Sequence, residues 1–140
     1  MRREYVDAVL DLTSLIPPGR VLSYGDVAEL LETSGPRQVG AVLARFGAAA
    51  CWWRVIRASG LPPQGHGLAA WTFYRLEGTP VAGRPEPDGS GYRVRMATAR
   101  WVPAAEAAVG VEQIRDRLQA VLPPAGDRQP GSEQRDGPSI

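Results

Sequence analysis

The segment from Arg37 to Phe46 constrains the fold more than any other part of the chain. Its apolar residues recur at positions i, i+3, i+4 and i+7, which is the spacing of one face of an α-helix, and we expect this face to be buried: Val39, Val42, Leu43 and Phe46. The opposite face combines small residues with two arginines: Arg37, Gly40, Ala41, Ala44 and Arg45. Because no long side chain stands between the arginines, the helix backbone can approach another surface closely. Arginine also suits phosphate, since its guanidinium binds through two parallel hydrogen bonds.

Two further helices are predicted upstream of this segment. A stripe of apolar residues indicates a helix over residues 2–16, which Pro17 and Pro18 end: Tyr5, Val9, Leu12 and Ile16. Ser23 is predicted to cap a second helix, with Asp26 completing a capping box. The second and third helices, with a turn over residues 33–36, resemble a helix-turn-helix unit. A helical hairpin that binds nothing is the alternative.

The segment Cys51-Trp52-Trp53-Arg54-Val55-Ile56 holds two of the four tryptophans of the chain. Its bulky apolar residues predict a short buried strand that ends at residues 57–60. Aromatic rings beside an arginine are suited to holding a flat ring by stacking and cation–π contact. The alternative interpretation is that both tryptophans fill the core.

The remaining pattern predicts a mostly α fold with a small β component, a winged-helix-like helix-turn-helix DNA-binding domain. We expect residues 60–67 to form a loop beside the site, residues 68–77 a helix, and residues 79–82 and 91–97 a hairpin with a basic face. Residues 1–103 would form the domain and residues 104–122 a C-terminal helix, with Val111, Ile114, Leu118 and Val121 on one side. The composition of residues 123–140 predicts a disordered tail.

Charge is unevenly distributed, although the net charge is only +1. Residues 33–100 carry nine arginines and three acidic residues, and all 16 basic residues of the chain are arginine. A basic middle between more acidic ends favours a polyanion as partner, nucleic acid above all. A solvated basic face is the alternative that composition leaves open.

Other classes of function have little support in the sequence. The single cysteine, Cys51, can form no internal disulfide, which favours a reducing, cytoplasmic compartment. One histidine, His66, and one cysteine give no zinc-ligand spacing, and no phosphate-binding glycine motif is present. No apolar run reaches the length of a membrane span. We therefore expect a monomer with no metal, no cofactor and no membrane partner.

Three ordered motifs resemble the DNA-binding domain of the O6-alkylguanine-DNA alkyltransferases. Residues 16–28 read Ile-Pro-Pro-Gly-Arg-Val-Leu-Ser-Tyr-Gly-Asp-Val-Ala and resemble its Ile-Pro-x-Gly-x-Val-x-Ser-Tyr-Gly-x-Val-Ala stretch. Residues 36–40 resemble its Ala-Arg-x-Val-Gly segment, and residues 51–56 align with its Pro-Cys-His-Arg-Val-Ile active-site motif. The resemblance covers residues 4–80.

The departures from this pattern concern the catalytic residues. The alkyl-accepting cysteine of the family falls on Trp52, and the histidine that activates it falls on Trp53. Cys51 takes the place of the motif's proline, and alternation along a strand would turn it away from the side that Trp52 faces. Phe46 stands where the repair enzyme has an asparagine, and the segment before the motif is shorter. Because an indole is no nucleophile, the chain resembles the alkyltransferase-like proteins, which carry this tryptophan and transfer nothing.

The resemblance implies a non-catalytic DNA damage sensor. Such a protein binds O6-alkylguanine in double-stranded DNA by nucleotide flipping and passes the lesion to nucleotide excision repair proteins. It implies a helix in the minor groove, with DNA contacts from Tyr24, Arg37, Gln38, Gly40, Ala41 and Arg45. It implies a lesion pocket formed by Tyr24, Trp52, Trp53, Arg54, Val55 and Gly60.

Individual roles also follow from the resemblance. Arg37 would fill the gap in the duplex, Tyr24 would press on the phosphate of the flipped nucleotide, and Trp52 would contact the lesion. Arg54 would brace the site, or would form a purely structural ion pair with Glu77. Glu77 matches the carboxylate that orients the histidine and would have nothing to orient here.

Two other functions stay open at this point. One is a winged-helix regulator that reads a DNA sequence, and the other is a residual alkyltransferase that uses Cys51.

Overall fold

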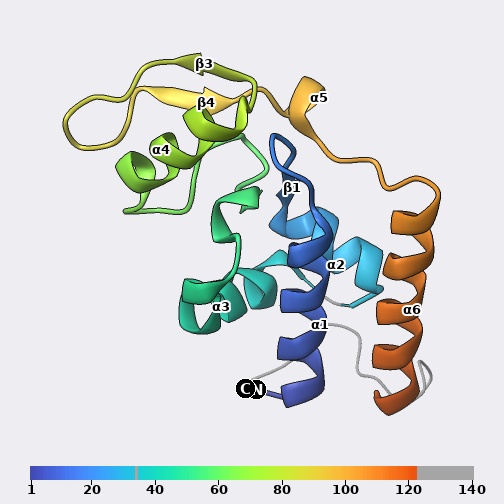
Figure 1. The fold of residues 1–140 in the computed structure, drawn as a ribbon. Coiled ribbons are helices and arrows are strands. Elements are labelled where there is room, and N and C mark those ends of the chain that lie inside the picture. The colour runs from blue at the N-terminus through green and yellow to red at the C-terminus, as the bar shows by residue number, and fades with distance from the viewer. Residues whose placement is uncertain (34, 123–140) are drawn as a thin grey trace.

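The computed structural model describes residues 1–33 and 35–122 of the chain. Figure 1 shows a helical lower part and an upper part that carries a β-hairpin. The elements follow one another as α1 (Arg3–Leu15), β1 (Leu22–Ser23), α2 (Tyr24–Leu31), α3 (Pro36–Phe46), the 3₁₀ turns η1 (Gly47–Ala49) and η2 (Trp52–Arg54), β2 (Val55–Ile56), α4 (Gly67–Glu77), β3 (Val81–Gly83), β4 (Tyr92–Val94), α5 (Met96–Ala99) and α6 (Glu106–Val121). The predicted class, mostly α with a small β component, is confirmed.

The main core lies between α1, α2, α3 and α6. The apolar stripe predicted for α1 is buried throughout: Tyr5, Val9, Leu12 and Ile16. From α6, Val111, Ile114 and Leu118 join the same core, so the C-terminal helix packs into the helical domain. The amide of Gln119 donates to the carbonyl oxygens of Leu31 (2.8 Å) and Glu32 (3.1 Å), where α2 ends. Arg117 pairs with Asp11 of α1 at 2.8 Å.

Local signals in the sequence set the ends of the helix-turn-helix. The predicted capping box of α2 is confirmed, because Ser23 Oγ accepts from the Asp26 amide at 3.0 Å and Asp26 Oδ2 accepts from the Ser23 amide at 2.9 Å. Pro36 is the first residue of α3, where its fixed φ suits the helix and no backbone N–H is needed. Helix α3 therefore starts at a position dictated by its own sequence.

The double-tryptophan segment is not the predicted strand. Trp52–Arg54 forms the 3₁₀ turn η2, closed by the Arg54 amide donating to the Cys51 carbonyl at 3.0 Å. Only Val55 and Ile56 continue as β2, which pairs in parallel with β1. Because β1 is just two residues long, it offers no pairing partner for the tryptophans. The expectation that strand alternation separates Cys51 from Trp52 is therefore wrong.

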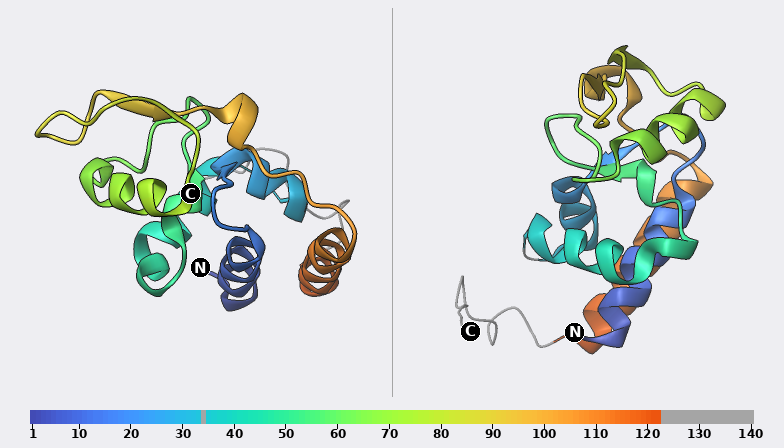
Figure 2. Two further views of the ribbon diagram at one scale, coloured as in Figure 1. Left: turned by 45° about the horizontal axis from the view of Figure 1, so that its top comes forward. Right: turned by 90° about the vertical axis from the view of Figure 1, so that its left-hand side faces the viewer.

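The predicted hairpin is present but shorter than expected. β3 pairs with β4 in antiparallel register, and the chain then turns into α5 at Met96 instead of continuing as a strand to residue 97. Arg93 and Arg95 are exposed, and the buried Tyr92 and Val94 pack in a second apolar cluster with Ile56. The views agree that the hairpin lies at the opposite end of the molecule from α3, with α4 between them (Figures 1 and 2). This hairpin therefore does not form a wing beside α3.

Two apolar side chains are less buried than their helical spacing predicts. Phe46, assigned to the buried face of α3, is 41% exposed at the end of the helix, with the Arg45 guanidinium 5.3 Å from its ring centre. Val121, in the last position of α6, is 43% exposed. Both lie where the helix passes the edge of the core. The predicted tail, residues 123–140, lies outside the described residues.

Candidate nucleic-acid interface

A cavity opens between α3, η1, η2 and the loop before α4. It has a volume of about 470 Å³. The lining consists mostly of apolar and small residues: Tyr24, Gly40, Leu43, Ala44, Gly47, Ala48, Trp52, Pro63, Gln64 and His66. It is open to solvent and apolar on most sides, which suits a flat organic ring better than a charged ligand.

Trp52 is the largest side chain in this lining. Its ring contacts three other aromatic rings, with centroid distances of 5.3 Å to His66, 5.7 Å to Trp53 and 6.1 Å to Phe73. The contacts with Trp53 and Phe73 are edge-to-face, a favourable arrangement for aromatic pairs. These contacts hold a half-buried indole in a fixed position at the cavity.

Small residues keep the cavity open on the side of α3. A methyl group at Gly40 would lie 3.9 Å from the Tyr24 ring, so the tyrosine packs directly over the glycine. A methyl group at Gly47 would approach Leu43 Cδ2 to 3.3 Å and Trp52 Cβ to 3.7 Å. Larger side chains at these positions would crowd the lining. The small outer face of α3 thus shapes a cavity as well as leaving the helix backbone accessible.

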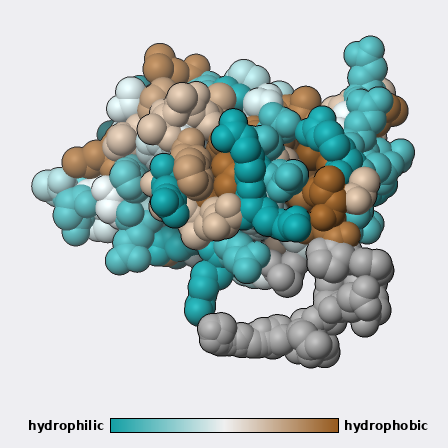
Figure 3. Space-filling view, turned by 90° about the horizontal axis from the view of Figure 1, so that it is seen from below, coloured by the Kyte–Doolittle hydropathy of each residue, from teal (hydrophilic) through white to brown (hydrophobic). Residues whose placement is uncertain are grey.

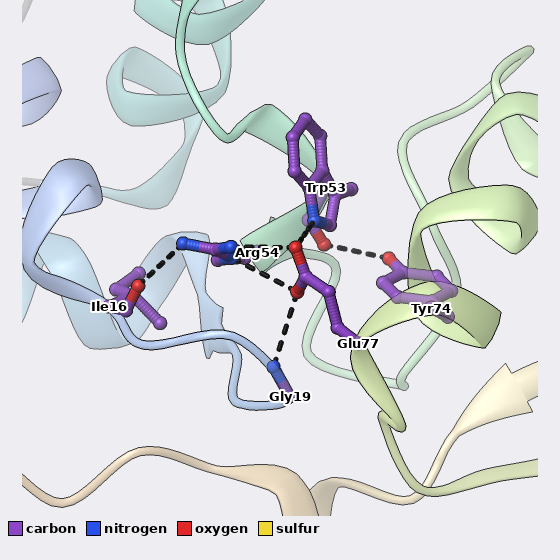
Figure 4. Close-up of polar contacts among 6 residues, drawn as sticks. All are labelled: Ile16, Gly19, Trp53, Arg54, Tyr74 and Glu77. Carbon is purple, nitrogen blue, oxygen red and sulfur yellow. Dashed lines mark hydrogen bonds and ion pairs between the residues drawn. The ribbon is translucent and has the colours of Figure 1, made fainter.

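Glu77 is the centre of a polar cluster on the other side of η2 (Figure 4). Its carboxylate binds the Arg54 guanidinium through two hydrogen bonds, at 2.6 Å from Nη2 and 3.1 Å from Nε. It also accepts from Trp53 Nε1 at 3.0 Å and from the Gly19 amide at 3.2 Å. The remaining Arg54 nitrogen, Nη1, donates to the Ile16 carbonyl at 2.8 Å. The cluster joins the end of α4, the turn η2 and the segment after α1.

Trp53 belongs to this cluster and not to the cavity. Its ring stacks on Phe73 with a centroid distance of 3.6 Å and an angle of 6°. Its carbonyl accepts from the Tyr74 hydroxyl at 2.8 Å. The expectation that Glu77 has nothing to orient is therefore wrong, because the carboxylate holds the Trp53 indole through its N–H.

The ionisation of the cluster follows from these contacts. Burial alone would raise the pKa of Glu77, but the hydrogen bonds from Arg54, the Gly19 amide and Trp53 outweigh it and lower the pKa. The hydrogen bonds to Glu77 raise the pKa of Arg54. Both side chains are therefore charged at neutral pH. A carboxylate with four donors around it is a structural anchor, since it has little basicity left for proton transfer.

The residues predicted to contact DNA lie in two environments. Arg37, Gln38, Ala41 and Arg45 are exposed along α3. Tyr24 and Gly40 are half-buried and line the cavity. Seen from below, the surface shows apolar patches bordered by hydrophilic side chains (Figure 3). The structure thus brings an arginine-bearing helix and a cavity together around Gly40.

The predicted pocket residues are only partly gathered at the cavity. Tyr24 and Trp52 line it, whereas Trp53 and Arg54 face Glu77, and Val55 is fully buried in the main core. Gly60 is buried against the carbonyl of Val94, where its missing side chain and its φ of +91° are both required.

Sequence reasoning missed several lining residues that the small-residue pattern signals. Gly47 and Ala48 come from the run Gly-Ala-Ala-Ala directly after α3, and Ala44 was noted only for its small size. Pro63, Gln64 and His66 come from the loop that was expected to form a wall, which the structure supports.

The part of the chain that the structure describes holds one free thiol and no metal-binding cluster. Cys51 is a free, half-buried thiol just before η2, and it does not line the cavity. No cluster of His, Cys, Asp and Glu in this part of the chain could hold a metal ion. Nor is any helix there both long enough and apolar enough to cross a membrane.

A family model for the DNA-binding domain of 6-O-methylguanine DNA methyltransferase matches residues 4–77. The chain belongs to this family. The matched segment runs from α1 to the end of α4, so it contains both the cavity and the Arg54–Glu77 cluster. The hairpin and α6 lie beyond it.

The fold is also similar to a solved structure of this kind. The crystal structure of S. pombe Atl1 in complex with damaged DNA containing O6-carboxymethylguanine matches with a TM-score of 0.61 and 24% sequence identity. The match covers 74% of this chain and 100% of Atl1. No curated protein sequence matches the chain. In this methyltransferase-family chain, Trp52 is the largest side chain of the cavity lining, and an indole is no nucleophile.

Proposed function

We propose that this chain is a non-catalytic, alkyltransferase-like sensor of O6-alkylguanine in double-stranded DNA. The observation that carries the proposal is that Trp52, at the position where the family's nucleophile falls, lines an apolar cavity beside an arginine-bearing helix. The lining offers a place for a base, and the thiol of Cys51 lies outside it.

Recognition would proceed by nucleotide flipping. An alkylated guanine leaves the stack at a cost of a few kcal/mol, which weakened base pairing reduces. Arg37 stands in the first turn of α3 and is exposed, so it can enter the space that the base leaves. The small residues along α3 allow its backbone to approach the minor groove, and Tyr24 stands at the rim where the flipped nucleotide would pass.

Within the cavity, the base would meet a pre-formed apolar wall. A volume of about 470 Å³ is in the range of small-molecule pockets. Trp52 would contact the alkyl group, and its own aromatic neighbours hold it in place before DNA arrives. S. pombe Atl1, which shares the fold, is bound to DNA containing O6-carboxymethylguanine. The bound complex would then present the lesion to nucleotide excision repair proteins.

Equilibrium binding to duplexes that differ at a single base tests the proposal. We expect tighter binding when one guanine carries an O6-methyl group, in at least two unrelated sequence contexts, and a steep loss of affinity as salt increases because arginines displace condensed cations. Preference for one undamaged sequence would instead identify a sequence-specific regulator. Mass spectrometry of the protein after incubation provides the control for chemistry, since a methyl group on Cys51 would show a residual alkyltransferase.

A further inference from the structure

The wall of the cavity contains one imidazole side chain. His66 lines the cavity and its ring lies 5.3 Å from that of Trp52. It is the only histidine of the chain. Histidine is the side chain that ordinarily gains or loses its charge between pH 5 and 8. No hydrogen bond or ion pair holds its ring within residues 1–33 and 35–122, so the ring nitrogens are available to a ligand.

The rest of the lining is uncharged. Tyr24 is the other titratable lining residue, and burial raises its pKa, which keeps it neutral. The charged groups on the surrounding elements lie outside the lining. Arg37 and Arg45 are exposed along α3, and Arg57 is held by the Pro62 carbonyl at 2.7 Å and 3.0 Å. The Cys51 thiol, before η2, and the Arg54–Glu77 pair lie outside it as well. His66 is therefore the lining side chain that can carry a positive charge, and Arg57, outside the lining, is close enough to Tyr24 to act on it electrostatically.

We propose that His66 sets the choice between neutral O6-alkyl and anionic O6-carboxyalkyl groups, and that this choice depends on pH. The inference rests on the proposed function and specifies the lesions that the same cavity accepts. With neutral His66, an apolar cavity disfavours a carboxylate, because a buried charge without a partner is costly. Protonated His66 offers a charge-assisted hydrogen bond to that carboxylate.

The placement of His66 makes the two classes of lesion respond differently. Because the imidazole lies beside Trp52, it stands next to the wall that would meet the O6 substituent and not at the helix that would meet phosphate. A neutral methyl group gains nothing from the proton. The general pH dependence of DNA binding affects both lesions equally. The ratio of the affinity for the carboxymethylated lesion to that for the methylated lesion therefore reports on His66 alone.

Fluorescence anisotropy with three duplexes tests this inference. The duplexes are identical except for one position, which is guanine, O6-methylguanine or O6-carboxymethylguanine, and binding is measured near pH 6 and near pH 8. For the natural chain we expect the affinity for carboxymethyl relative to methyl to rise about threefold to tenfold at the lower pH, the scale of one hydrogen bond to a charged group. The His66→Gln variant should show the same ratio at both pH values.

A matched control addresses the one thiol of the chain. Cys51→Ala removes the only thiol and should leave the pH response of the ratio intact. A constant ratio in the natural chain, or a pH response that survives in His66→Gln, would overturn the inference. If the methylated duplex binds no more tightly than the undamaged one at either pH, the proposed function fails. If the methylated duplex is preferred but the carboxymethyl-to-methyl ratio does not change with pH, the proposed function stands and only the role of His66 is refuted.

Discussion

The two sides of the turn Trp52–Arg54 differ in how completely their polar and aromatic groups are engaged. On one side, Arg54 and Glu77 have side chains only 11% and 12% exposed, and every charged atom has a protein partner. On the other side, Trp52 borders an open cavity whose shape depends on missing side chains at Gly40 and Gly47. Adjacent residues therefore lie in two different environments, one fully engaged and one open to solvent. The side on which a residue lies therefore predicts whether its substitution changes the free energy of unfolding or the cavity.

The largest effect is expected when the engaged side loses its carboxylate charge. Glu77→Gln leaves the Arg54 guanidinium buried without a counter-ion and should lower the free energy of unfolding by about 3–5 kcal/mol. Urea denaturation followed by circular dichroism measures this. Trp53→Phe is the matched control, because it removes one neutral donor, keeps the stack on Phe73, and should cost only about 1 kcal/mol. Equal losses in the two variants would contradict the central role of the ion pair.

The same cluster gives stability an acid dependence. The pKa of Glu77 is lower in the folded state than in the unfolded chain, where it is near 4.3. Its contribution is therefore fully present above the unfolded pKa and is lost as the pH falls through the folded pKa. Comparing unfolding of the natural chain and of Glu77→Gln from pH 6 downward should show the difference between them shrinking below that unfolded value.

A smaller effect, on binding and not on folding, is expected at the exposed helix. Arg37→Ala should weaken binding to a lesion-containing duplex by about 1–3 kcal/mol while the free energy of unfolding stays nearly unchanged, because the side chain is exposed. Anisotropy titration measures the first quantity and urea denaturation the second. Arg93→Ala, on the hairpin at the far end of the molecule, removes the same charge and serves as the control. Equal losses of binding would show only a general charge effect.

The smallest effect, no detectable alkyl transfer, is expected from restoring the missing thiol alone. In Trp52→Cys the new thiol would stand at the cavity, but its neighbour Trp53 offers an N–H donor that already binds Glu77 and no base. The thiol would keep the high pKa of an unactivated cysteine. Mass spectrometry after incubation with an O6-methylguanine duplex is the measurement. Complete transfer by this single variant would refute the account.

The double variant Trp52→Cys with Trp53→His sharpens the same comparison. Glu77 accepts from Trp53 Nε1, so a histidine at this position would find its orienting carboxylate in place. We expect any transfer to appear only in this variant. Its smaller side chains would leave a cavity beside Phe73 and should cost a few kcal/mol of stability.

The parts of the fold that depend on near neighbours in sequence were predictable. Asp26 follows Ser23 by three positions in the capping box, and the stripe of α1 repeats over about three turns, so both are visible in the sequence. The turn at Trp52 was not, because six bulky residues fit a strand or a helical turn equally well. The contacts that decide the conformation of this turn come from distant positions. Glu77 lies 24 residues after Trp53, and β2 pairs with β1 through Leu22 and Val55.

The residues of the candidate site also divide into those that the sequence predicts and those that depend on distant contacts. The exposed arginines and small residues of α3 were predicted from its periodicity, and the loop at residues 60–67 was expected to form a wall. The assignment of Trp53, Arg54 and Val55 to the pocket followed from the family resemblance, whereas the structure places the first two against Glu77 and Val55 in the main core. The lining residues Gly47 and Ala48 would have required knowing where α3 ends relative to η2.

The contact of α6 with α1 and with the end of α2 has a consequence for how the protein folds. Arg117 and Asp11 are 106 positions apart, and Gln119 reaches the carbonyl of Leu31 across 88. Pairings between such distant positions delay folding, because the entropy of closing a long chain is lost before the contact forms. On the ribosome, the matched family segment emerges well before its covering helix. The helices α1 and α2 therefore gain this support only after α6 has been synthesised, and until then their apolar faces leave the nascent chain exposed to aggregation.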